Sequence, residues 1–263
     1  MKKLLALFIL LLFSSISVSA MEKVKHEGSI MNEELKITDP DFYEISNHFI
    51  YEEAAKVGNL STKEQELIRI VVLTVNQQPD SLKNCVKEAL KNGVTPVEIK
   101  EAVYQTAPYA GISRAEIAVK AVNEVFKKEG IKLPVESQKT TSADNRYDKG
   151  LATQVKIFGE GMKSRKAEAP EGQKHIPEFL SDYCFGDFYT RNGLDLRERE
   201  LLTLCMLVAL GDTESQIKGH IQGNLNMGNN KDTLIAAIAQ CLPFIGFPRT
   251  LNAMKYLNET VKE

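Results

Sequence analysis

The sequence predicts an all-α protein built from two tandem helical repeats. Apolar residues recur at helical spacing along the chain, and no segment shows the period of two that is typical of strands. In addition, residues 41–129 resemble residues 175–262, at an offset of 134 that becomes 135 after one inserted residue. We expect about five helices in each repeat, joined by a linker at residues 130–174.

The clearest repeated segment is a turn, TAPYAGISRAEIAVKAVNE at 106–124 and CLPFIGFPRTLNAMKYLNE at 241–259. Its proline, glycine and arginine recur in register: Pro108, Gly111 and Arg114 in the first copy, Pro243, Gly246 and Arg249 in the second. We expect each proline to end one helix, because the residue before a proline is disfavoured in helical conformation. Each glycine would then allow the reversal into the last helix.

Helix starts are indicated by a cap residue followed three positions later by Glu. Three such pairs occur: Ser61 with Glu64, Thr95 with Glu98, and Asp195 with Glu198. Gly93 and Gly228 are placed just beyond a predicted helix end, where a left-handed residue is favoured.

Residues 1–20 form a different kind of segment. Lys2 and Lys3 precede an apolar run, and small residues follow, with Val18 and Ala20 at the −3 and −1 positions of a cleavage site. The alternative is a membrane anchor, although an uncharged stretch of about 17 residues is marginal for a span. We expect a signal peptide cut after Ala20, an exported protein that is periplasmic or secreted, and no membrane segment after cleavage.

Composition excludes several classes of function. The chain has 33 basic and 35 acidic residues and a net charge of −2, which gives no electrostatic case for nucleic-acid binding. His26, His48 and His175 have no Cys or carboxylate at ligand spacing, so no metal site is expected. A glycine-rich loop after a strand is also missing, so no nucleotide-binding fold is expected. Three of the four cysteines lie in apolar helical patterns, which favours buried thiols over disulfides.

His220 and Glu200 are the candidate catalytic residues. His220 lies on a predicted helix with Gly219 and Gly223 beside it, which suggests close approach to another helix or to a ligand. Glu200 opens an otherwise apolar stretch, so it needs a partner if it is buried. Together they would form a proton relay in which the carboxylate orients the imidazole. The alternatives are a structural His220 and an exposed first-turn Glu200 that interacts with the helix dipole.

Arg249 is the candidate substrate-binding residue. An Arg just after a glycine turn can bind a carboxylate with two hydrogen bonds. It can equally tie the turn to a neighbouring helix or subunit, and the sequence leaves both roles open.

The segment 197–257 resembles the carboxymuconolactone decarboxylase family, through Glu200, His220 with the following NLNMG, and PFIGFPRTLNA. Residues 63–125 resemble the same family more loosely. The resemblance implies cofactor-free decarboxylation of a small carboxylated lactone and assembly into a homo-oligomeric ring, with a trimer as the first expectation. It also implies Glu200 and His220 as the family's acid and histidine.

Another branch of that family, the alkylhydroperoxidase D-like proteins, carries a CxxC motif before the histidine. The resemblance places those two cysteines at Thr213 and Gln216, and in the first copy at Gln78 and Ser81, with Cys85 in the histidine position. Neither copy has the redox pair. We therefore expect a cofactor-free lyase acting on a small carboxylated lactone or related acid. A non-catalytic binding or scaffold protein is the alternative, and a peroxidase ranks below both.

Overall fold

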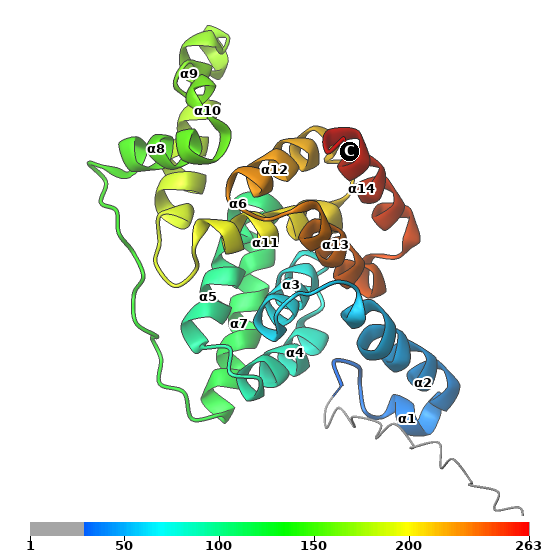
Figure 1. Ribbon diagram of the computed structural model, residues 1–263. Coiled ribbons are helices and arrows are strands. Elements are labelled where there is room, and N and C mark those ends of the chain that lie inside the picture. Colours follow the sequence, from blue (N-terminus) through cyan, green and yellow to red (C-terminus); the bar gives the residue numbers. More distant parts are fainter. Residues whose placement is uncertain (1–28, 263) are drawn as a thin grey trace, which may run out of the picture.

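The computed structural model describes residues 29–262, and all its regular elements in this range are helical (Figure 1). The predicted signal peptide, residues 1–20, lies outside the described residues. Between residues 29 and 262, no helix has the length and apolar character needed to cross a membrane.

The first half of the described chain contains seven α-helices and two short η segments, which are π- or 3₁₀-helical. They are α1 (Leu35–Thr38), α2 (Pro40–His48), η1 (Phe49–Glu53), η2 (Ala54–Lys56), α3 (Thr62–Val75), α4 (Pro79–Lys91), α5 (Pro96–Gln105), α6 (Ala107–Ala110) and α7 (Ile112–Lys128).

The second half continues the same kind of structure. Its elements are α8 (Arg146–Phe158), η3 (Glu160–Lys163), α9 (Arg165–Glu168), η4 (Glu171–Gln173), α10 (His175–Phe179), η5 (Leu180–Tyr189), α11 (Leu196–Leu210), α12 (Glu214–Asn226), α13 (Lys231–Ile245) and α14 (Phe247–Thr260).

Matching elements confirm the predicted tandem repeat. Under the sequence offset, α3, α4, α5 and α7 correspond to α11, α12, α13 and α14, and α2 with η1 corresponds to α10 with η5. All three predicted caps form complete capping boxes, in which the cap side chain and the Glu each bond the other's backbone amide.

The repeated turn differs from its prediction, because neither proline ends a helix. In the first copy α5 already ends at Gln105, and Pro108 lies in the first turn of α6, where a missing amide hydrogen costs little. In the second copy Pro243 lies inside α13. The helices end instead at the glycines, where φ is 96° at Gly111 and 76° at Gly246.

The two repeats pack against each other through α3 and α11, and their buried apolar residues form one continuous core. Two ion pairs cross this contact in a reciprocal way. Lys63 lies 2.5 Å from Glu198, and Arg197 lies 2.8 Å from Glu64. Since Lys63 corresponds to Arg197 and Glu64 to Glu198, the two repeats contact each other through equivalent surfaces.

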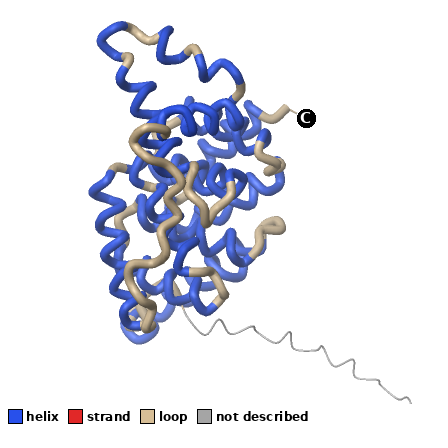
Figure 2. The backbone as a smooth tube through the Cα atoms, turned by 90° about the vertical axis from the view of Figure 1, so that its left-hand side faces the viewer, coloured by secondary structure: helices blue, strands red, loops and turns tan. Residues whose placement is uncertain are grey.

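The segment predicted as a linker also packs against the second repeat. Residues 131–145 run without helix along one side of the molecule (Figure 2), and α8 then packs against η5. Two glycines allow this contact: a Cβ at Gly150 would lie 1.9 Å from the Ser181 carbonyl oxygen, and one at Gly186 would lie 2.3 Å from that of Arg146. The linker thus places α8 beside the second repeat.

Candidate active site

Glu200 lies at the centre of the site, inside the protein. The capping box at Asp195 starts α11, and Glu200 follows in its second turn with no solvent exposure. The alternative of an exposed first-turn acid is therefore wrong. A carboxylate that is removed from water requires hydrogen-bond donors around it.

His220 provides one of these contacts. Its Nδ1 lies 2.9 Å from Oε2 of Glu200, and its side chain keeps 11% exposure. Nε2 has no hydrogen-bond partner among the described residues, and the ring borders a cavity. The structure therefore brings the two predicted catalytic residues together, with one ring nitrogen on the carboxylate and the other free for a ligand.

Gly223 and Asn224 hold α12 close to α11. A Cβ at Gly223 would lie 2.4 Å from Oε2 of Glu200, so only glycine fits there without displacing the carboxylate. The Asn224 amide donates to the carbonyl oxygens of Glu200 (2.9 Å) and His220 (2.7 Å). These contacts fix the imidazole against its carboxylate. A Cβ at Gly219, in contrast, would meet no atom within 4 Å, and this glycine borders the cavity.

Two tyrosines complete the surroundings of Glu200. Tyr189 donates from its hydroxyl to Oε1 of Glu200 at 2.8 Å and lies 2.7 Å from the Thr203 hydroxyl. Tyr109, from the first repeat, donates to the Tyr189 hydroxyl at 2.9 Å. Burial raises the pKa of both tyrosines well above the usual value, so both remain neutral donors.

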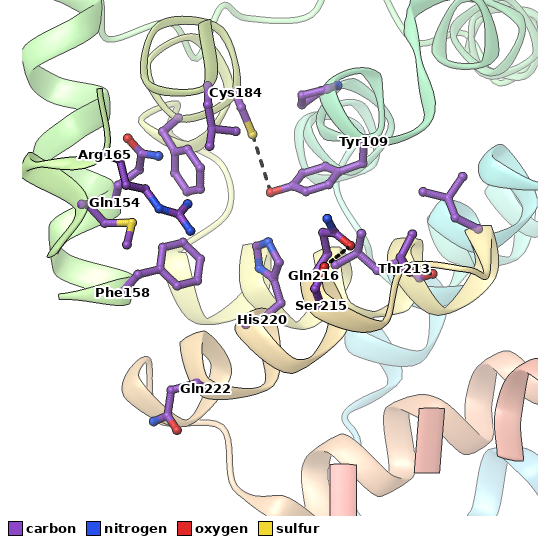
Figure 3. A pocket seen from close by; sticks show the side chains of 17 residues that line it. Tyr109, Gln154, Phe158, Arg165, Cys184, Thr213, Ser215, Gln216, His220 and Gln222 are labelled. Carbon is purple, nitrogen blue, oxygen red and sulfur yellow. Dashed lines mark hydrogen bonds between the residues drawn. The ribbon is translucent and has the colours of Figure 1, made fainter. Parts of the chain in front are cut away.

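The cavity beside His220 has a volume of about 700 Å³. Its apolar lining residues are Pro108, Phe158, Met162, Leu180, Phe185, Leu207 and Leu210. Figure 3 shows His220 between Phe158, Gln154 and Arg165 on one side and Tyr109 on the other. The wall combines the first repeat, the linker and the second repeat, and its size and apolar lining suit a small organic ligand.

Arg249 lies elsewhere. Its Nη1 donates to the Ala209 carbonyl oxygen at 2.6 Å, and it borders a separate cavity of about 240 Å³. Arg114 makes the matching contact in the first copy, to the Val75 carbonyl oxygen at 3.1 Å. The structure thus gives both arginines the role of tying the turn to a helix end, and it does not bring Arg249 to the His220 cavity.

The first repeat has no equivalent pair. Glu66, in the position of Glu200, is buried against Arg69 (3.0 Å) and Asn92 (2.8 Å). Cys85 takes the histidine position, and burial raises the pKa of its thiol well above the usual value. Arg69 corresponds to Thr203. The first copy therefore pairs its buried Glu66 with an arginine, whereas in the second copy Glu200 contacts His220 and Tyr189.

All four cysteines are buried, and burial was predicted for Cys85, Cys205 and Cys241. Cys184 borders the cavity and lies 3.6 Å from the Tyr109 hydroxyl. Burial raises the pKa of its thiol to about 12. Thr213 and Gln216, which occupy the CxxC positions of the peroxidase branch, also border the cavity. Within residues 29–262, no group of His, Cys, Asp and Glu could hold a metal ion.

Sequence reasoning missed Tyr109, Tyr189 and Arg165. Tyr109 carried a signal, because it lies in the repeated turn where the second copy has Phe244, and a difference inside a repeat can mark a special role. Tyr189 and Arg165 lie in short irregular helices, whose spatial partners the local pattern does not indicate.

The sequence model of the carboxymuconolactone decarboxylase family matches this chain twice, at residues 40–124 and 175–259. The chain belongs to the carboxymuconolactone decarboxylase family. Both matches fall on the two helical repeats, and the second includes Glu200 and His220.

Three curated proteins are similar to the chain. The 4-carboxymuconolactone decarboxylase of Acinetobacter baylyi is 30% identical over 121 residues, which cover 46% of this chain and 90% of the relative. Peroxisomal protein 2 of Schizosaccharomyces pombe is 22% identical over 187 residues, 68% of this chain and 84% of the relative. The nitrosuccinic acid decarboxylase of Metarhizium robertsii is 22% identical over 118 residues, 44% of this chain and 82% of the relative.

Proposed function

We propose that this protein is a carboxy-lyase, which releases CO₂ from a small carboxylated acid or lactone in the His220 cavity. The observation that carries the proposal is the 2.9 Å contact between Nδ1 of His220 and the fully buried Glu200, which leaves Nε2 facing an apolar cavity. Two similar proteins are named as decarboxylases, which supports the same class of reaction.

The chemistry follows from this arrangement. The bond between the carboxylate and its carbon breaks, CO₂ leaves, and the electron pair moves into a carbonyl group conjugated to that carbon. His220 donates a proton from Nε2 to the resulting carbanion, and the ring then takes a proton from water. Glu200 orients the ring and compensates its positive charge. Because the substrate's own carbonyl takes up the electron pair, we propose a route without a cofactor.

The test is CO₂ release from a panel of small lactones and acids that includes 4-carboxymuconolactone and nitrosuccinate. We expect turnover by the wild type and a loss of about 10² to 10⁴ in kcat for His220→Ala and Glu200→Gln. Glu214→Gln is the matched control, since Glu214 lies on α12 but faces solvent beside Lys218. Equal activity of wild type and His220→Ala would contradict the proposal. Thermal stabilisation by an acid that depends on His220, without turnover, would favour the binding-protein alternative.

We also propose that the protein is exported and forms a homo-oligomer. Export is supported by the signal pattern of residues 1–20, and the test is the N-terminal residue of the protein in the periplasm or medium, expected to be Met21.

Oligomerisation is supported by apolar side chains left in solvent on α14, with Phe247 60% and Leu251 63% exposed. Light scattering should give a multiple of one chain's mass, a trimer first, and Leu251→Glu should reduce it.

A further inference from the structure

Gln105 is the last residue of α5 in the first repeat, and it is fully buried where α5 packs against α11. Its amide oxygen accepts from Nη1 of Arg199 at 2.7 Å. Its Nε2 donates to the Thr203 hydroxyl at 2.9 Å and to the Arg199 carbonyl oxygen at 3.0 Å. The Thr203 hydroxyl lies 2.7 Å from that of Tyr189, which donates to Oε1 of Glu200. Buried hydrogen bonds thus lead from Gln105 to the Glu200 carboxylate.

Arg199 fixes the orientation of the Gln105 amide. A guanidinium only donates, so the amide oxygen must face Arg199 and the NH₂ group must face Thr203. The guanidinium is itself held in place, because its Nη2 donates to Oε2 of Glu101 at 3.1 Å and to two backbone carbonyl oxygens. The Thr203 oxygen therefore accepts a hydrogen bond from Gln105.

Thr203 differs in its contacts from other threonines within helices. Several of these donate to the carbonyl oxygen four residues earlier, at 2.8–2.9 Å: Thr74, Thr153 and Thr250. For Thr203 that carbonyl belongs to Arg199. Its oxygen has two lone pairs, of which the helical N–H takes one and Nε2 of Gln105 the other. Gln105 therefore occupies the acceptor to which the Thr203 hydroxyl would otherwise donate.

We propose that Gln105 is a positioning residue of the second repeat's site, which directs the Tyr189 proton onto Glu200. With its usual acceptor occupied, Thr203 donates to the Tyr189 oxygen, and the single proton of Tyr189 remains for Oε1 of Glu200. A hydrogen bond to a carboxylate favours the ionised form. The proposed mechanism needs an ionised Glu200 opposite the imidazolium of His220, so the catalytic part of this inference rests on the proposed function.

The equivalent glutamine of the second repeat makes a related contact in the other direction. Gln240 corresponds to Gln105, and in the orientation that satisfies both groups its amide oxygen accepts from Nε of Arg69 at 2.8 Å. Arg69 and Thr203 are equivalent, and each follows the buried acid of its own helix by three residues. Each repeat therefore contributes one glutamine to the other's acid. Gln240 accepts from a cation there, whereas Gln105 donates to a hydroxyl.

The titratable side chains that face Glu200 are His220 from α12 and Tyr189 from η5, with Tyr109 from α6 and Cys184 from η5 behind them. Burial raises the pKa values of both tyrosines and of the thiol, so these groups stay neutral. A change in protonation at this site therefore falls on Glu200 or His220.

The first experiment follows Glu200 by infrared spectroscopy of the purified protein without substrate. The carbonyl band of its protonated form is identified as the band that Glu200→Gln lacks. In Gln105→Met, Thr203 can donate to the Arg199 carbonyl and compete as an acceptor for the Tyr189 proton. On acidification we expect the band to appear about one pH unit higher than in the wild type, a tenfold change in the equilibrium.

Removing the Thr203 hydroxyl should reverse this effect. Thr203→Val deletes the competing acceptor, so the double variant with Gln105→Met should regain the wild-type titration, whereas a merely structural Gln105 predicts no recovery. Gln240→Met is the matched control, because it removes an equally buried glutamine from the first repeat's acid and should leave the band in place.

Gln105→Glu is the second variant if Gln105→Met does not fold. It keeps the size of the side chain and the acceptor for Arg199, loses the donor to Thr203, and should give the same shift and the same recovery with Thr203→Val. The proposal is overturned by an unchanged band in the Gln105 variant, by an equal shift in Gln240→Met, or by a shift that persists with Thr203→Val.

The second experiment measures kinetics with the substrate that releases CO₂ fastest in the panel described above, at the pH where the infrared titrations differ most. We expect a kcat about tenfold lower in Gln105→Met, with KM changed less than about twofold, and recovery of kcat with Thr203→Val. The infrared pattern without CO₂ release from any substrate would refute the proposed function and still confirm that Gln105 positions the Tyr189 proton. CO₂ release that depends on His220 but not on Gln105 would overturn the positioning role alone.

Discussion

The hydroxyl of Tyr109 lies 2.9 Å from that of Tyr189, and this hydrogen bond joins the two repeats directly behind the Glu200 carboxylate. The Tyr189 hydroxyl in turn donates to Oε1 of Glu200 at 2.8 Å, while Nδ1 of His220 contacts Oε2. A residue of the first repeat is therefore part of the second repeat's site. Both copies contribute side chains to the site, although only the second carries an acid together with an imidazole.

Removing the Tyr189 hydroxyl tests this network. Tyr189→Phe leaves one oxygen of a buried carboxylate without its donor, and we expect a loss of about 1–3 kcal/mol in the free energy of unfolding. Tyr109→Phe should cost less, because Tyr189 keeps its contact with Glu200. Urea unfolding measures both. Tyr43→Phe is the control, since Tyr43 donates to Glu33 in solvent, and a loss there as large as in Tyr189→Phe would argue against the network.

Two glycines on α12 should respond in opposite ways to the same substitution. Gly223→Ala would place a methyl group 2.4 Å from Oε2 of Glu200, and we expect destabilisation of about 1–3 kcal/mol together with reduced activity. Gly219→Ala meets no atom within 4 Å, so it should stabilise the helix by up to about 1 kcal/mol. Thermal unfolding of the two variants checks this, and the contrast fails if both shift the midpoint in the same direction.

Lys100 should make the stability depend on pH. It is buried on α5 with its ammonium 2.5 Å from Oδ1 of Asn123, and burial lowers its pKa from 10.5 to about 8. Below pH 8 both folded and unfolded chains carry the proton, and the penalty on the buried charge applies in full. Between about pH 8 and 10.5 the folded chain binds fewer protons than the unfolded one, so its stability rises with pH.

The test replaces Lys100 by Met. At pH 7 the variant should be more stable than the wild type, by at most about 3 kcal/mol, since 1.36 kcal/mol corresponds to one pKa unit. The difference should shrink as the pH approaches 10.5, where the ammonium is neutral in the folded state and half neutral in the unfolded one. Free energies of unfolding in urea at pH 7 and pH 10 measure it. A difference that grows toward pH 10 would refute the lowered pKa.

The cysteines should support no peroxidase activity. Burial raises the pKa values of Cys85 and Cys184, so neither supplies the accessible thiolate that attacks a peroxide. We expect no turnover of cumene hydroperoxide with a dithiol reductant, and no difference between wild type, Cys85→Ser and Cys184→Ser. Turnover in the wild type that either substitution abolishes would restore the peroxidase alternative.

The sequence predicted the helical class, the tandem repeat, the capping boxes and the pairing of Glu200 with His220. These features depend on local patterns, on self-similarity and on the requirement that a buried acid has a partner. It did not predict the continuation of α13 through Pro243, because packing around the last turn outweighs the loss of one amide hydrogen bond.

Arg249 shows why binding residues are harder to predict than fold. Its position after a glycine turn is compatible with a ligand or with a helix carbonyl, and only the three-dimensional position of Ala209 decides between them. Arg165 shows the reverse case: it lies in a polar, irregular stretch that indicates solvent exposure, and it is exposed, but the fold of residues 159–179 also brings it to the edge of the cavity.

The reciprocal pairs Lys63–Glu198 and Arg197–Glu64 have a consequence for how this site could arise. Two identical subunits related by a twofold axis would have to change together, because one gene would specify both. Joining the halves in one polypeptide removes that constraint. One half can then exchange an imidazole for a thiol and a threonine for an arginine, while its tyrosine contributes to the neighbour's site. Covalent fusion thus permits division of labour between two halves that still meet through the same surface.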